Sequence, residues 1–389
     1  IFISPNFPEN YRFFCQRLRE NGAVVLGIGS EEYDNLNPDL AVALTEYYKV
    51  NALENYDEVL RACGFFTHKY GKIHRIESHN EYWLEQDAQL REDFNVPGYR
   101  PGSLISAKRK SEMKKHFRNA GIPVAEGRLL HKKKDALEFI KSSGFPVCIK
   151  PDIGVGAADT HKINTLEELE LFLVNRNLDD KKYIIEEWIH GEIVSFDGIT
   201  DMDGKILFQG SFHLDTGVME IIKDDLDVFY YTLRTPDQKL VKLGQKAVAE
   251  FNIRERFFHL EFFRKSDGSY IALELNSRPP GGMTIDMYNY AVDGDLYDLY
   301  AKVVMGKNVE FIKEFPYYAA FAGRKNSKSY LYSIDELVKL YKDVIVSHRP
   351  LPSLYSESMG DYAFILRDAD FEKIKSAVTG ILERSCSYV

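Results

Sequence analysis

The first hundred residues alternate between short apolar runs and helical patterns. Residues 1–4 (IFIS) and 23–29 (AVVLGIG) are apolar runs of strand length, and helical patterns occupy residues 8–20 and a stretch near 52–62. This alternation predicts a small α/β layer built around a mostly parallel sheet. The loop after the first run lacks the glycine pattern G-x-G-x-x-G, so the sequence does not predict a dinucleotide site there.

The pattern changes after a Pro-Gly-rich linker at residues 96–103. A basic helix is expected over 108–118, and a strand, a Gly-rich loop and a second strand are expected across 144–163. Thr165 begins a capping box for the next helix, and an apolar strand is expected at 183–189. This middle part of the chain is therefore expected to form α+β layers.

Further helices and strands are expected in the last third of the chain. A helix should have Thr235 at its N-cap, Pro236 in its first turn and Gln238 closing a capping box. A mixed segment should follow from residue 311. Its expected elements are a helix near 333–342, a strand near 361–366 and a helix near 369–384.

One predicted β-hairpin carries polar side chains at matching positions of its two strands. Its Asp-Gly pair predicts a two-residue type I′ turn, which sets Glu261 opposite Glu274 and His259 opposite Asn276. Two carboxylates directly across a ladder are destabilising unless a cation lies between them. Glu261, Glu274 and Asn276 together offer hard oxygen ligands, which predicts a site for Mg²⁺ or Mn²⁺.

The predicted metal site implies a nucleoside triphosphate, because Mg²⁺ with few protein ligands keeps positions for water and substrate phosphates. Lys150 ends an apolar strand just before a loop in which Gly154 and Gly156 would let backbone N–H groups approach phosphate oxygens. Arg278, two positions beyond Asn276, is a candidate for stabilising the charge of a transferred phosphoryl group.

Other nucleotide-binding patterns are absent from the sequence. No G-x-x-x-x-G-K-[ST] occurs, and no H-R-D or D-F-G follows the strand that ends at Lys150, which argues against a P-loop protein and a protein kinase. The stretch 183–198 offers a strand edge for adenine and a carboxylate, Glu192, for ribose hydroxyls. By themselves, Glu186 and Glu187 are more typical of charged residues on a strand.

Composition narrows the class of protein. A chain of 389 residues with 44% hydrophobic and 28% charged residues suggests an ordinary globular protein of two to four packed units. The formal net charge of −9 argues against a nucleic-acid partner. No apolar run approaches the roughly 18 residues that span a bilayer. Four scattered cysteines predict reduced thiols and a cytoplasmic location, and a homodimer is left open.

In this order, the segments of residues 105–310 resemble the ATP-grasp superfamily. The resemblance rests on Lys110 in KRKSEMKKHFRNAGIPV, Lys150 in PVCIKP, the loop 153–160 and the run IEEWI, followed by HGEIVSFDG, HLEFF and ELNSR. It implies a Rossmann-like α/β pre-ATP-grasp domain, then a two-lobed ATP-grasp fold and a small C-terminal α+β segment. The implied domains are 1–100 (pre-ATP-grasp), 101–182 (small lobe), 183–310 (large lobe with the metal site) and 311–389 (completing the large lobe).

The resemblance also implies a role for each motif residue. Lys110 and Lys150 would contact the phosphates of ATP, Glu192 would hold the ribose, and Arg278 and Lys150 would be catalytic. Two Mg²⁺ ions would lie on the metal triad described above. The remaining nucleotide-binding residues would come from the loop and the adenine slot: Gly154, Gly156, Glu186, Glu187, Trp188 and Ile189.

The implied activity is that of an ADP-forming ligase for small molecules. A carboxylate would be phosphorylated to an acylphosphate and coupled to an amine, with an amino acid or dipeptide ligase as the leading hypothesis, because RPPGG at 278–282 is similar to the loop of L-amino acid ligases. One alternative is a carboxylase or purine-type ligase that activates bicarbonate or formate. Another is an ATP-binding regulatory protein without turnover.

Several residues near these motifs have no assigned role. His259 shares the predicted metal face, and His213 is placed in a substrate-side loop, although a lone histidine is more often structural. Gly281 and Gly282 would either present N–H groups to a substrate carboxylate or simply begin a helix. Arg324 is a candidate carboxylate clamp but is more typical of a surface arginine.

Overall fold

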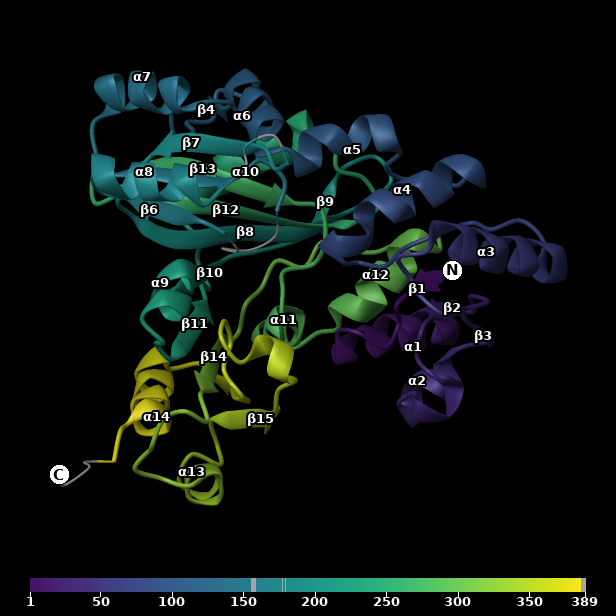
Figure 1. Cartoon of the computed structure of the whole chain (residues 1–389). Coiled ribbons are helices and arrows are strands. Elements are labelled where there is room, and N and C mark those ends of the chain that lie inside the picture. The colour runs from purple at the N-terminus through teal and green to yellow at the C-terminus, as the bar shows by residue number, and fades with distance from the viewer. Residues whose placement is uncertain (155–158, 177, 179, 386–389) are drawn as a thin grey trace.

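The computed structural model describes residues 1–154, 159–176, 178 and 180–385 (Figure 1). Within these residues, the fold is built from a three-stranded, a four-stranded and a nine-stranded sheet. The first sheet is parallel and the other two are antiparallel. This is the mixed α/β and α+β architecture that the sequence predicts.

The N-terminal layer is a parallel sheet in the order β1-β2-β3, as predicted from its alternating pattern. The helix expected at residues 8–20 is present, and the glycine after its last turn takes a φ of +96°. The strands are β1 (Phe2–Ile3), β2 (Leu26–Gly29) and β3 (Glu46–Lys49). The helices are η1 (Glu9–Tyr11), α1 (Arg12–Glu20), η2 (Tyr33–Asn35), α2 (Pro38–Ala43), α3 (Tyr56–Tyr70), η3 (Glu81–Trp83) and α4 (Leu84–Asp93).

The stretch expected to be a linker is largely structured. Val96 is buried, and helix α5 (Pro101–Lys108) begins inside the stretch, with Pro101 in its first turn. Proline suits that position because its φ is already helical and its missing N–H has no partner to lose there. Helix α6 (Lys110–Asn119) follows almost directly and contains most of the basic cluster.

The small lobe is the four-stranded sheet, with strand order β4-β7-β5-β6. Helices α7 and α8 pack on it, and Thr165 caps α8 as predicted. Because β7 pairs with both β4 and β5, the chain leaves this sheet only after Glu187. Its elements are β4 (Gly127–Leu130), α7 (Lys133–Ser143), β5 (Val147–Pro151), β6 (His161–Ile163), α8 (Leu166–Val174) and β7 (Tyr183–Glu187).

The large sheet runs in the order β13-β12-β8-β10-β11-β14-β16-β15, with β9 paired to β8. Its strands are β8 (Glu192–Thr200), β9 (Ile206–Gly210), β10 (Phe212–Leu214), β11 (Val228–Thr232), β12 (Phe257–Arg264), β13 (Tyr270–Asn276), β14 (Tyr318–Arg324), β15 (Ile345–Pro350) and β16 (Tyr362–Asp368). Its helices are α9 (Val218–Lys223), α10 (Gln238–Glu250), α11 (Thr284–Val292), α12 (Leu296–Val304), α13 (Ile334–Leu340), η4 (Ser353–Tyr355) and α14 (Phe371–Leu382).

Two local predictions in this region are wrong. Helix α10 is capped by Asp237, whose carboxylate accepts from the Lys239 N–H at 2.9 Å, so Thr235 lies outside the helix. Aspartate is a strong N-cap residue and takes the role from the more distant threonine. Strand β14 is not predicted at all, because it is buried on both faces and rich in alanine, which removes the alternation and the β propensity.

The hairpin turn also differs from its prediction. The Lys265 N–H bonds to the Ser269 carbonyl, and only Gly268 of the turn has a positive φ, +73°. A type I′ turn needs positive φ at both central residues, so this is a three-residue turn with glycine in the left-handed position. Pairing near the turn is therefore displaced by one residue, as Arg264 faces Tyr270.

A bulge then restores the predicted register. The pairing shifts between Glu261 and Phe262, and beyond that point Glu261 faces Glu274 and His259 faces Asn276. The two facing carboxylates are thus confirmed, although the turn that was expected to align them is of another type.

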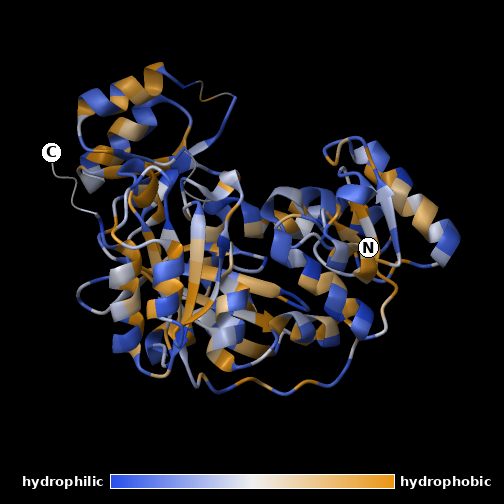
Figure 2. Ribbon diagram, turned by 90° about the horizontal axis from the view of Figure 1, so that it is seen from below, coloured by the Kyte–Doolittle hydropathy of each residue, from blue (hydrophilic) through white to orange (hydrophobic). Residues whose placement is uncertain are grey.

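The N-terminal layer packs directly against helix α12, which lies between β13 and β14 in the chain. Phe14 of α1 is fully buried, with its ring centroid 4.8 Å from that of Tyr297 and 5.3 Å from that of Tyr300 in α12. Figure 2 shows apolar residues concentrated along the strands inside the molecule. No helix among the described residues is long and apolar enough to cross a membrane. Cys15, Cys63 and Cys148 are free and buried, and Cys386 lies outside the described residues.

Candidate active site

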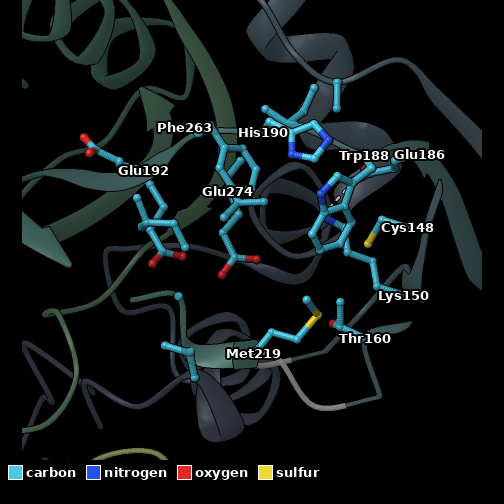
Figure 3. Close-up of a pocket in the computed structure, with 18 of the residues that line it drawn as sticks. Cys148, Lys150, Thr160, Glu186, Trp188, His190, Glu192, Met219, Phe263 and Glu274 are labelled. Carbon is cyan, nitrogen blue, oxygen red and sulfur yellow. Dashed lines mark ion pairs between the residues drawn. The ribbon is translucent and has the colours of Figure 1, made fainter. Parts of the chain in front are cut away.

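A cleft of about 510 Å³ lies between the small lobe and the first strands of the large sheet. This volume is within the range of small-molecule and cofactor sites. Figure 3 shows Lys150, Glu186 and Trp188 on one side of the cleft, with Glu192 and Glu274 on the other. The predicted residues that line it are Lys110, Lys150, Glu186, Glu187, Trp188, Ile189, Glu192, Glu261 and Glu274.

Glu186 is buried between two lysines on the small-lobe wall. Its carboxylate lies 2.8 Å from the Lys150 ammonium and 2.8 Å from that of Lys114. Although burial opposes ionisation, the two lysines lower the pKa of Glu186 to about 2, and Glu186 in turn raises the pKa of Lys150. Burial dominates at Lys114 and lowers its pKa. This group presents ammonium donors to the cleft, which suits a polyphosphate.

Lys110 joins the small-lobe loop to the large sheet. Its ammonium donates to the Gly154 carbonyl at 3.1 Å and lies 3.4 Å from the Glu274 carboxylate. The start of its helix is fixed by Asp152, whose carbonyl accepts from the Lys110 N–H at 2.9 Å. Gly156 lies outside the described residues, so its predicted contact with phosphate stays a prediction.

The two facing carboxylates lie on the opposite wall. His259 lies two positions before Glu261 on β12 and so on the same face of the strand. Its Nε2 is 3.7 Å from the Glu261 carboxylate, and its Nδ1 donates to Asp197 at 2.6 Å. Burial disfavours the charged imidazole, but Asp197 outweighs it and raises the pKa of His259 to about 10. Burial also opposes ionisation of Glu261, yet its contact with His259 keeps the pKa of Glu261 lowered.

The donor set on these strands fits Mg²⁺. Glu261 and Glu274 face each other, and the Asn276 amide lies next to Glu274, with 3.3 Å between its nitrogen and the Glu274 oxygen. No group of three or more His, Cys, Asp or Glu side chains in the described part of the chain is arranged to hold a metal ion. The predicted set of two carboxylates and an amide oxygen suits a hard cation that also binds water and phosphate.

The predicted adenine and ribose residues lie at the mouth of the cleft. Trp188 stacks under the Lys162 ammonium, which is 4.5 Å from the ring centroid. Glu187 accepts from the Glu126 N–H at 2.9 Å. Glu192 is ion-paired with Arg264, whose Nε lies 3.1 Å from the carboxylate, and is also 3.4 Å from His213. Ribose binding by Glu192 therefore requires exchange with, or sharing of, these partners.

Asn276 and Arg278 lie beyond the cleft at the end of β13. The Arg278 guanidinium donates to the Pro279 carbonyl at 2.7 Å, and its Nε is 3.6 Å from the Glu81 carboxylate of the N-terminal layer. The residues after it line a small hollow with Asn10 and Arg349.

The structure places Arg324 and distinguishes the two glycines after Arg278. Arg324 is buried and donates to the Ile381 and Tyr332 carbonyls at 2.5 and 2.8 Å, so it is neither a surface residue nor free to clamp a substrate. Of the glycine pair, Gly282 has a φ of +63° and lies against Met359, whereas an added Cβ at Gly281 would meet no atom.

Several cleft residues were not anticipated. Lys114 could have been found, because it lies one helical turn after Lys110 and therefore on the same face of α6. Lys162 could have been found from its place on β6, next to the strand of Lys150. The segment 214–220, which lines the cleft from the large lobe, carries no sequence pattern that indicates a site.

Part of the sequence that forms this site matches the model of a known protein family. The family model of the ATP-grasp domain matches residues 143–286, which include the small-lobe strand of Lys150 and the hairpin with Glu261 and Glu274. Residues 143–286 therefore form an ATP-grasp domain, as the predicted resemblance indicated.

Sequence relatives of this chain include amino acid ligases. The L-arginine-specific L-amino acid ligase of Bacillus subtilis is 27% identical over 290 residues, which cover 72% of this chain and 69% of that protein.

Solved structures match almost the whole chain in fold. The L-amino acid ligase from Bacillus licheniformis has a TM-score of 0.74 at 14% identity and covers 97% of this chain and 95% of its own. The N5-carboxyaminoimidazole synthetase from Staphylococcus aureus, complexed with ADP, has a TM-score of 0.73 at 15% identity and covers 98% and 96%. At these identities the similarity establishes the ATP-grasp fold alone.

Proposed function

We propose that the protein is an ATP-dependent, ADP-forming ligase that converts a carboxylate to an acylphosphate and couples it to an amine, with an amino acid as one substrate. The observation that carries this proposal is the cleft in which a buried lysine group faces a pair of carboxylates. Lys150 lies on the small-lobe wall, Glu261 and Glu274 lie on the large-lobe wall, and Lys110 reaches Glu274 across the gap. The 27% identity to an L-amino acid ligase supports the choice of an amine acceptor.

The residues can perform this chemistry mainly by positioning and by cancelling charge. Lys110 and Lys150 would bind the phosphates of ATP, and their ammonium groups would offset the charge of the transferred phosphoryl group. Glu261, Glu274 and Asn276 would hold Mg²⁺, which when bound would supply Lewis-acid stabilisation of the phosphate charge. The Arg278 guanidinium would stabilise the negative charge of the acylphosphate by donating hydrogen bonds from two of its nitrogens.

The remaining nucleotide contacts belong to the same proposal. Trp188 and Ile189 would contact the adenine, and Glu192 the ribose. Gly154 and Gly156 would bring the loop close to the phosphates. The domain boundaries 1–100, 101–182, 183–310 and 311–389 are likewise proposed, except that β7 (Tyr183–Glu187) pairs with β4 and β5 and so belongs to the small lobe. The strands of the last segment join the large sheet.

An ADP-release screen tests the proposed reaction. Purified protein is incubated with ATP, Mg²⁺ and paired amino acids or small carboxylates, and the products are identified by mass spectrometry. We expect ADP and phosphate to appear only with a matching pair, together with a product whose mass is the sum of the pair minus one water. Absence of ADP release across a broad panel contradicts the proposal.

The same screen separates the other two hypotheses. The fold is similar to that of an N5-carboxyaminoimidazole synthetase to nearly the same degree, so bicarbonate and formate are included as carboxylate substrates. ADP release that depends on bicarbonate, without any amino acid, favours the carboxylase or purine-type alternative. ATP binding whose affinity is unchanged by Mg²⁺, without turnover, favours a regulatory protein.

A further inference from the structure

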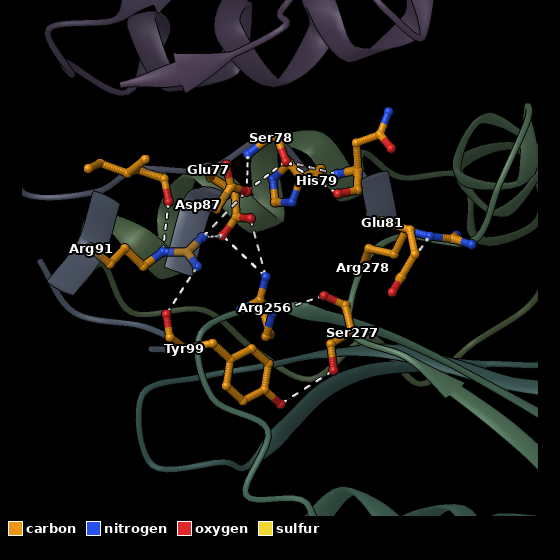
Figure 4. Close-up of polar contacts among 12 residues, drawn as sticks. Glu77, Ser78, His79, Glu81, Asp87, Arg91, Tyr99, Arg256, Ser277 and Arg278 are labelled. Carbon is orange, nitrogen blue, oxygen red and sulfur yellow. Dashed lines mark hydrogen bonds and ion pairs between the residues drawn. The ribbon is translucent and has the colours of Figure 1, made fainter. Parts of the chain in front are cut away.

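A buried network of charged groups connects the N-terminal layer to the end of β13 (Figure 4). Its centre is Glu77, on the edge of the parallel sheet, where the Ile3 N–H donates to the Glu77 carbonyl at 2.9 Å. The Glu77 carboxylate lies 3.0 Å from Arg91 and 3.2 Å from Arg256. Arg91 belongs to the N-terminal layer, whereas Arg256 immediately precedes β12, so this carboxylate bridges two parts of the chain.

Arg256 uses its guanidinium to hold the residue between the candidate metal ligand and the candidate catalytic arginine. Its Nη2 donates to Glu77, and its Nε donates to the Ser277 carbonyl at 3.1 Å. Arg256 is nearly fully buried, so both contacts form away from water, where hydrogen bonds to charged groups are strongest. Ser277 lies directly between Asn276 and Arg278 in the chain.

A tyrosine completes the contact with Ser277. The Tyr99 ring lies under the Arg256 guanidinium, 4.7 Å from its centroid, and the Tyr99 hydroxyl is 3.3 Å from the Ser277 hydroxyl. Ser277 is itself fully buried. Its backbone carbonyl and its side chain are therefore both held, one by Arg256 and the other by Tyr99.

The same N-terminal segment also reaches the next residue. Glu81, four positions after Glu77, is buried with its carboxylate 3.6 Å from the Arg278 Nε. Two acidic residues of one short segment thus act on consecutive positions, with Glu77 acting on Ser277 through Arg256 and Glu81 acting directly on Arg278. Hydrogen-bonded and ion-paired partners of this kind orient the groups that bind metal and substrate.

We propose that the segment Glu77–Glu81 positions Asn276 for the metal and Arg278 for the phosphoryl group. Glu77 acts through Arg256, and Glu81 acts directly on Arg278. This inference rests on the proposed function for its consequence in turnover. Arg256, Glu77 and Tyr99 are positioning residues, because none of them lines the cleft among the described residues. The N-terminal layer then has a part in the nucleotide chemistry.

The test compares ATP affinity with and without Mg²⁺ in Arg256→Lys. Lysine retains the positive charge beside Glu77, but its single terminal nitrogen replaces the two guanidinium nitrogens that reach Glu77 and the Ser277 carbonyl. We expect the ratio of the ATP Kd in EDTA to the ATP Kd in Mg²⁺ to fall by about 10-fold, as for other partners of metal ligands. We expect kcat for ADP release to fall by at least as much, while the Kd in EDTA stays within about twofold.

Arg324→Lys is the matched control. Arg324 is also buried, donates to the carbonyls of Ile381 and Tyr332, and lies over a tyrosine ring, with 4.2 Å to the Tyr330 centroid. A loss of packing alone should lower the melting temperature of both variants and leave the Mg²⁺ ratio of the control at the wild-type value. If Arg256→Lys does not fold, Tyr99→Phe provides the same test, because it removes one hydroxyl only.

The outcomes separate the inference from the proposed function. The positioning role is overturned if folded Arg256→Lys, or Tyr99→Phe in its place, keeps the wild-type kcat and the wild-type ratio of the ATP Kd in EDTA to that in Mg²⁺. A wild-type protein that shows Mg²⁺-enhanced ATP binding but no turnover overturns only the proposed function, and the ratio in the variants still decides the inference. If the wild-type protein binds ATP equally well in EDTA and in Mg²⁺, both this inference and the metal site are overturned.

Discussion

The Lys150 ammonium and the Glu186 carboxylate form a buried ion pair 2.8 Å apart on the small-lobe wall. Lys150 is on β5 and Glu186 on β7, two strands that are hydrogen-bonded to each other, and both side chains point into the cleft. A glutamate expected near adenine is thus the partner of the lysine that we propose to bind phosphate. Its role is to keep that ammonium charged and oriented where burial alone would discharge it.

The strength of this pair can be measured by a double-mutant cycle. Lys150→Met, Glu186→Gln and the double variant should give a coupling free energy of about 1–3 kcal/mol in denaturant unfolding, because the pair is buried. The exposed pair Lys134 and Glu138, 3.5 Å apart, is the control and should give about 0.5 kcal/mol or less. Equal coupling in both pairs would contradict the proposed partnership.

Removal of Glu274 should abolish metal-dependent behaviour without unfolding the protein. Glu274→Ala deletes one of two facing carboxylates, so repulsion in the metal-free protein falls and its melting temperature should stay the same or rise. The further rise on adding Mg²⁺ and ADP should disappear, and ADP release should fall by more than about 100-fold, since even indirect partners of a metal cost about 10–100-fold.

Glu372→Ala is the control for that experiment, because Glu372 is exposed on α14, far along the chain from the cleft. It should retain the wild-type thermal shift and rate. Near wild-type turnover in Glu274→Ala would remove the metal assignment, whereas loss of turnover in both variants would indicate a general effect on folding.

His79 should make the protein less stable in acid. It is fully buried, and burial lowers its pKa from 6.5 to about 4. Between these values the unfolded chain binds one more proton than the folded one, so the free energy of unfolding decreases as pH falls from 6.5 to 4. The full loss from this group is about 3 kcal/mol, at about 1.4 kcal/mol for each pKa unit.

His79→Phe retains an aromatic ring against Phe14 and Tyr300 but removes the titration. Denaturant unfolding at pH 7 and pH 5 should therefore show a smaller loss of stability for this variant than for the wild-type protein. The exposed His74, changed to phenylalanine, should leave the wild-type loss unaltered. An identical pH dependence in all three proteins would show that His79 does not stay neutral in the fold.

The glycine pair after Arg278 should respond unequally to alanine. Gly282 has a φ of +63°, so Gly282→Ala should cost about 1 kcal/mol of stability and displace the Met359 side chain, which lies 2.3 Å from the added Cβ. Gly281→Ala has no such clash or strain and should be nearly neutral in unfolding. If Gly281→Ala nevertheless weakens carboxylate binding in the ADP-release assay, a substrate role for this loop is supported.

Sequence predicted the local features of this protein better than its long-range ones. The pairing of Glu261 with Glu274 was predicted because a hairpin closes over a few residues and its pattern is local. The prediction of the turn type was wrong, because a bulge of one residue has no marker in the sequence.

Contacts between distant segments could not be read from the sequence. The pairing of Glu186 with Lys114 joins residues on a strand and a helix, and the link from Glu77 to Arg256 spans the chain from the first sheet to the last. Such contacts depend on how the layers dock, which no local period encodes. Lys114 is an exception in part, because its helical spacing from Lys110 indicates a shared face.

The bulge between Glu261 and Phe262 has a consequence for engineering the hairpin. The pairing of the strands near the turn is in one register, and the pairing of the two carboxylates beyond the bulge is in another. The exposed turn at Ser266–Gly268 is therefore a suitable place to insert a peptide tag or a fluorescent label, since strand pairing deeper in the sheet is anchored by β8 on the other side of β12.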